Sequence, residues 1–319
     1  MRRTASIFAL TGAMALVGCT DATMAPPTSA RPELRPTPAA ITAPVPPRAE
    51  PSSASAALST YYARAQADLQ ARGLLRTDGG RVDTPFDAET LIRNFETLAF
   101  YDEYERGRGL TPARNVSGNL RRWEDPVRMT IEFGASVPPE QRTADRAVIN
   151  GYADRLARVT GHPISTGADG NFYVMVLGED DRVAALPRIQ SIVPNMNPAT
   201  LRIIRDIPRS IHCLVIAFSD VENDFVYRKA IAIMRAEHPP LLRRSCVHEE
   251  LAQGLGLAND SPRARPSIFN DDDEFALLTT HDEMLLQMLY DPRLTPGMTL
   301  DQARPIFTRI ARELAGGSS

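Results

Sequence analysis

Hydrophobic and polar positions follow two different periods along this chain, and these periods predict where helices and strands lie. Apolar residues recur at helical spacing over residues 57–72 and 87–104, which predicts two amphipathic helices. The second begins with acidic residues and has an apolar stripe that includes Leu91 and Phe95. We expect its aromatic side chains to lie in a core. The pattern therefore predicts a helical segment over residues 56–110.

Beyond about residue 115 the pattern alternates between segments typical of strands and segments typical of helices. Strands are expected at 127–133, 171–178, 211–219 and 227–236, where apolar residues alternate or run continuously. Helices are expected at 139–161, 199–207 (or a loop here), 241–257 and 280–292. This order predicts an α/β (α+β) domain over about 115–310. We expect a mixed sheet packed by the long helix 139–161 and by the helix 241–257.

The first residues predict an export signal. An arginine pair precedes a short apolar segment, which is too short to cross a membrane as an ordinary helix. Leu16-Val-Gly-Cys19 then resembles a bacterial lipobox, which implies that residues 1–18 are removed and that Cys19 carries a lipid. The alternative is an ordinary secretory signal with a chance cysteine. Residues 19–55 are rich in proline and alanine, which predicts a disordered tether.

Composition and charge narrow the class of protein. The chain has 319 residues, of which 43% are hydrophobic and 24% are charged, so it can bury a core. Its net charge is -3, and no basic patch is interleaved with aromatic residues, so we expect no nucleic-acid partner. Together with the signal, this predicts a bacterial envelope protein that faces the periplasm. It would be attached to the inner or the outer membrane by its lipid anchor without spanning it.

Two further cysteines, Cys213 and Cys246, remain for the exported chain. Two thiols in an oxidising compartment usually form a disulfide. Because Cys213 opens an apolar strand and Cys246 lies on the helix 241–257, such a bond would tie that strand to that helix. The alternative is that Cys246 is a metal ligand.

The candidate chemistry lies in the stretch CVHEELAQGLGLAND, residues 246–260. A zinc-protease helix needs two ligands four residues apart, so that both project from one face, with a glutamate beside the first. His248 is followed by a glutamate, but the position four residues further on is Ala252, which cannot bind a metal. In this register the His-Glu pair is therefore a false match.

Shifted by one residue, the same stretch resembles the metzincin metallopeptidase motif. Glu250 stands at the general-base glutamate, and Gly256 stands at the glycine where the chain turns. The three zinc-binding positions hold Glu249, Gln253 and Asn259, so all three motif histidines are replaced. The resemblance implies a metzincin-like fold without the usual zinc ligands.

Two later stretches extend this resemblance and point to a second family. Ser267-Ile-Phe269 resembles the tight turn that follows the zinc ligands in metzincins, and residues 278–290 resemble the helix after it. Residues 246–260 together with the Ser-Ile-Phe-Asn-Asp stretch also resemble the DUF2927 proteins, a family of uncharacterised bacterial proteins that are often lipoproteins. The resemblance implies a DUF2927 domain over 115–310 but carries no activity.

Helix geometry predicts how the motif is presented. At about 100° per residue, Cys246, Glu249 and Gln253 share one face with Glu250 beside it, opposite an apolar side that should pack on the sheet. We expect this polar face to line a cleft or to meet solvent. His238 and His281 have no partner at ligand spacing, so we expect surface or capping roles for them.

The donor types limit the metals that this site would accept. Carboxylate and amide oxygens favour Ca²⁺, Mg²⁺ or Mn²⁺ over Zn²⁺, so the site holds no cofactor or a divalent cation. Alternatively, Gln253 and Asn259 bond each other and Glu249, replacing a metal.

Three functions follow from these patterns. The first is a non-catalytic envelope module, a pseudoenzyme that holds a peptide-like or protein partner by strand addition. The second is a metal-dependent peptidase with Glu250 as general base. The third is an envelope assembly component that makes its contacts through the helical segment 57–104.

Overall fold

A computed structural model describes residues 50–80, 82–104, 113, 116–219, 223–270 and 272–316. The expected signal over 1–18, the lipidation site Cys19 and all but the end of the expected tether lie outside these residues. No helix in the part of the chain that the structure describes is long and apolar enough to cross a membrane.

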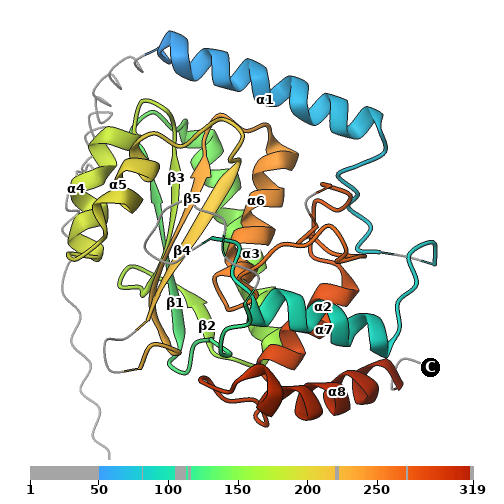
Figure 1. The fold of residues 1–319 in the computed structure, drawn as a ribbon. Coiled ribbons are helices and arrows are strands. Elements are labelled where there is room, and N and C mark those ends of the chain that lie inside the picture. Colours follow the sequence, from blue (N-terminus) through green and yellow to red (C-terminus); the bar gives the residue numbers. More distant parts are fainter. Residues whose placement is uncertain are drawn as a thin grey trace, which may run out of the picture. The chain divides into compact units, whose positions relative to one another are not determined.

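A five-stranded mixed sheet forms the centre of the domain, in the order β2-β1-β3-β5-β4 (Figure 1). β1, β2, β3 and β5 pair in parallel, and β4 pairs antiparallel with β5 at one edge of the sheet. The strands are β1 (Val127–Phe133), β2 (Ile164–Thr166), β3 (Phe172–Leu177), β4 (Cys213–Ser219) and β5 (Tyr227–Arg235). All four strands expected from the sequence are present, and the short β2 was not expected.

Eight helices surround this sheet in the described residues. They are α1 (Ser53–Ala71), α2 (Ala88–Phe100), α3 (Pro139–Thr160), α4 (Arg182–Ile192), α5 (Pro198–Arg205), α6 (Pro240–Gln253), α7 (Thr280–Leu289) and α8 (Leu300–Gly316). The fold is therefore the mixed α/β class that the sequence predicts, with α3 and α6 packed on the sheet. The sequence reasoning did not predict α4 or α8.

The sheet carries a hydrophobic core on each face, which explains the continuous apolar runs in its inner strands. α4 and α5 cover one face, where Ile189 and Ile204 pack against Ile231 and Ile233 of β5 (Figure 1). α3 and α6 lie on the other face, in a larger core that extends to α2, α7 and α8. The interior of β5 is buried because its side chains supply both cores in alternation.

α1 begins four residues earlier than the expected helix, at Ser53. Its N-cap Ser52 side chain accepts a hydrogen bond from the Ser55 backbone N–H, which satisfies a group that the first turn leaves unpaired. The last residues of the expected tether are therefore helical. α1 docks through the hydrogen bond from Ser55 Oγ to Glu237 at 2.8 Å and through buried side chains such as Tyr62 and Leu69.

α6 ends at Gln253, four residues before the end of the expected helix. The chain turns at Gly256, whose φ of +132° is open to glycine and strained for other residues. A Cβ at this position would lie 2.4 Å from the backbone oxygen of Arg121. The turn glycine of the motif is thus needed for both its backbone angle and the close approach of another segment.

Candidate functional site

α6 carries the motif residues Glu249, Glu250 and Gln253 and is buried on nearly all sides. Cys246 is 1% exposed, Glu250 4% and Gln253 9%, while Glu249 is partly buried. We expected the polar face of this helix to line a cleft or to meet solvent, and this prediction is wrong for Cys246, Glu250 and Gln253, which are buried. The apolar side is in the main core as expected. The polar side meets β4, His238 from the residues before the helix and Asp260 from the residues after it.

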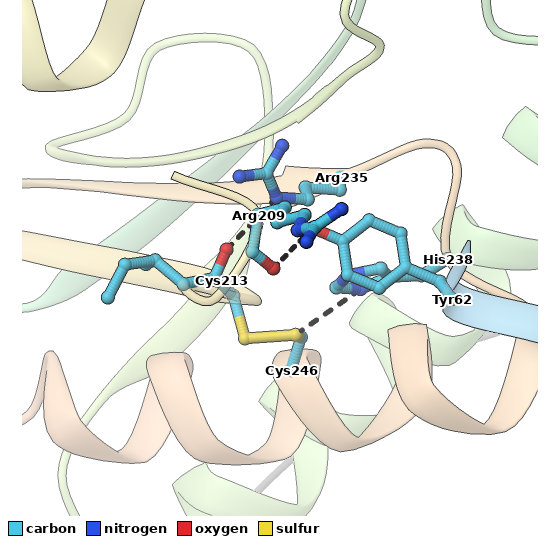
Figure 2. The surroundings of a disulfide bond; sticks show 7 residues. Tyr62, Arg209, Cys213, Arg235, His238 and Cys246 are labelled. Carbon is cyan, nitrogen blue, oxygen red and sulfur yellow. Dashed lines mark hydrogen bonds between the residues drawn. A yellow bond between two sulfur atoms is a disulfide. The ribbon is translucent and has the colours of Figure 1, made fainter. Parts of the chain in front are cut away.

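A disulfide between Cys213 and Cys246 joins the edge strand β4 to α6, as the cysteine count predicts (Figure 2). His238 lies beside it, with its ring nitrogen Nδ1 3.6 Å from the sulfur of Cys246. His238 is only 2% exposed, so the expected surface role is wrong. Burial lowers its pKa well below that of a free histidine, so this ring is neutral. The bond fixes the edge strand against the helix.

His248 is a core residue rather than a metal ligand. Its Nδ1 accepts a hydrogen bond from the Leu278 backbone N–H at 3.0 Å, and its ring stacks on Tyr152 with centroids 4.0 Å apart. Burial lowers the pKa of His248 to about 3. The neutral ring thereby connects α6 to the segment before α7. This structural role explains why a histidine stands at position 248 although it does not fit the zinc-ligand spacing.

The carboxyl groups of Glu249 and Glu250 lie together near the disulfide. One oxygen of each and the sulfur of Cys213 all lie within 4.8 Å of one another. Burial raises the pKa of both glutamates well above the ordinary value, and the negative charge of Asp260 raises both further. The charge of Glu103 also contributes, so these four residues (Glu103, Glu249, Glu250 and Asp260) are called the carboxylate cluster below.

The other motif positions point to different partners. Gln253 donates from its side-chain amide to Asp260 Oδ1 at 2.8 Å, and Asn259 donates to the backbone oxygen of Thr97 in α2 at 3.0 Å. The two amide groups thus pair with Asp260 and with α2, instead of with each other. Gln253 orients a carboxylate, while Asn259 connects the loop after α6 to α2.

The turn after the motif is held by Asp282, which is fully buried. Its carboxylate accepts hydrogen bonds from the Ser267 hydroxyl and from the Ile268 backbone N–H at 3.0 Å. Asp282 also completes a capping box with Thr279 at the start of α7. Phe269 is fully buried in the main core. These bonds hold the turn against the start of α7.

Sequence reasoning missed several residues of this site. Glu103 and Asp260 belong to the carboxylate cluster. Burial and the Glu103 carboxylate raise the pKa of Tyr104, and the charges of Asp260 and Glu250 also act on it. Only Asp260 was within the motif, so no sequence signal pointed to the other two. His281 is fully buried at the start of α7, where its Nε2 lies 3.1 Å from the Asn94 amide, so a surface role is wrong for it too.

The structure thus defines an α/β domain in which a buried helix, α6, is cross-linked to a sheet edge and carries Glu249 and Glu250 of the carboxylate cluster. The chain belongs to the DUF2927 family, whose family model, described as a protein of unknown function, matches residues 88–309. α1 lies outside this match. No curated protein and no solved structure matches the chain.

Proposed function

We propose that this chain is a lipid-anchored component of the bacterial cell envelope that binds an extended peptide segment of a partner protein along β4. The observation that carries the proposal is that β4 forms one edge of the sheet and is partly exposed along its whole length. An exposed edge strand offers unpaired backbone groups to which an extended peptide can pair as an added strand. The lipid anchor on Cys19 remains a prediction from the sequence.

The register of the sheet identifies which backbone groups of β4 point outward. The N–H groups of Ala230 and Ala236 bond to the carbonyls of Asn171 and Leu177 on the β3 side. Because backbone groups alternate along a strand, Ile231 and Ile233 direct theirs toward β4. Their partners are Ile216 and Leu214. The intervening positions of β4, Val215 and Ala217, therefore present their N–H groups at the outer edge.

The disulfide and α6 support this binding surface. An edge strand that is free to move loses entropy when it pairs with a partner, whereas a fixed strand is already ordered. The bond from Cys213 to Cys246 fixes the first residue of β4 against the buried helix α6. β4 is thus held ready for pairing.

A peptide selection tests the proposal. Peptides of about twelve residues, long enough to pair with a strand of ordinary length, are selected from a random displayed library against the purified chain. We expect Val215→Pro to abolish binding of the selected peptides, because proline removes the outward N–H without removing a bond to β5. Val215→Thr keeps the shape and the N–H, and it should bind normally.

Hydrogen exchange supplies the second readout of this test. The amides of Val215 and Ala217 should become protected when the peptide is added. Peptides that bind Val215→Pro as well as the original chain, while that variant keeps its thermal stability, would refute strand addition at β4.

A metal-dependent hydrolase is the second candidate, and one observation favours it. Glu250 is 4% exposed and its pKa is raised, which suits a general base beside a bound peptide. Mass spectrometry of the selected peptides after incubation with the chain separates the two functions. Cleavage that disappears in Glu250→Gln would establish the hydrolase, whereas intact peptides support the non-catalytic module.

The third function, assembly through the helical segment 57–104, has less support. In the described part of this segment, the large exposed apolar side chains are Tyr61 and Val82. Two such residues do not form the contiguous apolar patch that an assembly surface requires.

A further inference from the structure

The carboxylate cluster contains oxygen atoms at the spacing of metal ligands. A carboxylate oxygen of Glu249, one of Glu250 and the sulfur of Cys213 lie within 4.8 Å of one another. The sulfur belongs to the disulfide with Cys246, so it offers no thiolate. The two carboxylates are therefore the metal-binding groups of this triplet.

A second observation is independent of this spacing. Glu250 is 4% exposed, and its Oε2 has no hydrogen-bond partner among the residues that the structure describes. An unpaired oxygen of a buried carboxylate costs more free energy than almost any other unsatisfied polar group. Such an atom needs an explanation, and a bound ion supplies one.

The charges around the two glutamates have the sign that attracts a cation. Asp260 and Glu103 both act on Glu249 and on Glu250, and both are acids. Asp260 is oriented by the amide of Gln253, so its carboxylate is held in place instead of turning to solvent. Several carboxylates at one partly buried place repel one another unless a proton or a cation neutralises them.

We propose that Glu249 and Glu250 bind a divalent cation that prefers oxygen ligands, Ca²⁺ or Mn²⁺, with the oriented Asp260 adding negative charge. The disulfide decides the type of metal, because it removes the sulfur donor that would favour Zn²⁺. The ligand set differs from the one that the motif predicts, since Asn259 is directed to α2. The ion would bind to the C-terminal half of α6, beside the disulfide that joins this helix to the start of β4.

Equilibrium dialysis measures this binding directly. The purified chain with its disulfide intact is treated with a chelator, dialysed, and equilibrated with CaCl₂ or MnCl₂ at neutral pH. We expect one ion per chain with saturable binding, and free Mn²⁺ seen by electron paramagnetic resonance should fall in step. Glu250→Gln and Glu249→Gln should each weaken binding at least tenfold, because each removes one of the two carboxylate ligands.

Glu283→Gln is the matched control. Glu283 is paired with Arg155 away from the cluster, so this variant loses the same charge and should bind the ion normally. Near-ultraviolet circular dichroism checks that each variant is folded. If Glu250→Gln does not fold, the partly buried Glu249 still supplies the test.

The absence of saturable binding of either ion to the folded chain would overturn the proposal. Undiminished binding by a folded Glu249→Gln variant would overturn it as well. The proposal does not rest on peptide binding at β4, since ion binding is measured without peptide and peptide binding can be repeated with chelator. Each can fail while the other holds.

Discussion

His248 gives the sharpest test of how the buried helix α6 is held. Its Nδ1 accepts the Leu278 N–H, and its buried ring has a pKa of about 3 in the folded chain. A histidine in the unfolded chain has a pKa of about 6.5, so the unfolded chain takes up a proton at higher pH than the folded chain does. The stabilisation by this neutral histidine is therefore complete above about pH 6.5 and is lost as the pH falls toward about 3.

The magnitude follows from the two pKa values. Protonation of His248 alone should lower the free energy of unfolding by about 2 kcal/mol between about pH 7 and pH 5, and by about 3 kcal/mol down to about pH 4. Asparagine can place an oxygen near the Nδ1 position but does not titrate. His248→Asn should therefore be less stable at neutral pH, by about 1–3 kcal/mol for the lost packing and imperfect bond, but should lack this part of the acid dependence.

Urea unfolding at several pH values measures the effect. The single tryptophan, Trp123, is buried and reports unfolding by fluorescence. The difference between the original chain and His248→Asn isolates this residue, because other titrating groups, including His238, are common to both. If the difference in free energy of unfolding stays constant from about pH 7 to pH 4, His248 does not titrate as a buried neutral group and the reasoning is refuted.

Three further changes test other parts of the site. Gly256→Ala should destabilise the fold by about 1–3 kcal/mol in thermal unfolding, because the residue has a positive φ and a Cβ would clash with the Arg121 oxygen. Gly151→Ala on α3, where a Cβ meets open space, should stabilise the fold by about 0.5–1 kcal/mol. Equal effects of the two substitutions would contradict this reasoning. The double variant Cys213→Ser, Cys246→Ser, which lacks the disulfide, should lose about 3–4 kcal/mol of stability in urea unfolding. The loss arises because the unfolded chain is no longer constrained by a bond between residues 33 positions apart. An unchanged urea midpoint would refute a role of the disulfide in stability. Glu250→Gln should stabilise the chelator-treated chain at neutral pH by about 1–3 kcal/mol in urea unfolding. Because burial raises the pKa of Glu250, this gain in stability should shrink as the pH falls and the original carboxyl takes up a proton. A gain in stability that grows in acid would refute this reasoning.

Much of the domain followed from the sequence because local patterns dictate local structure. The alternating and continuous apolar runs identified β1, β3, β4 and β5, and helical spacing identified α2, α3, α6 and α7. The two cysteines that remain after Cys19, together with the expectation of export, were enough to predict the disulfide. α4 and α8 each contain an internal proline, which disfavours helix locally, and tertiary packing overrides that preference.

The sequence by itself determined most of the elements, the disulfide and the family, because these depend on periodicity, residue type and motif. Only the tertiary structure decided the environment of each motif residue. Helical geometry placed Glu250 and Gln253 on a polar face, but it did not show that β4 and the residues on either side of the helix fold back over this face, so burial was not predictable. For the same reason, the meeting of Glu103 and Asp260 with α6, and the turning of Asn259 toward α2, are set by contacts that no local pattern encodes.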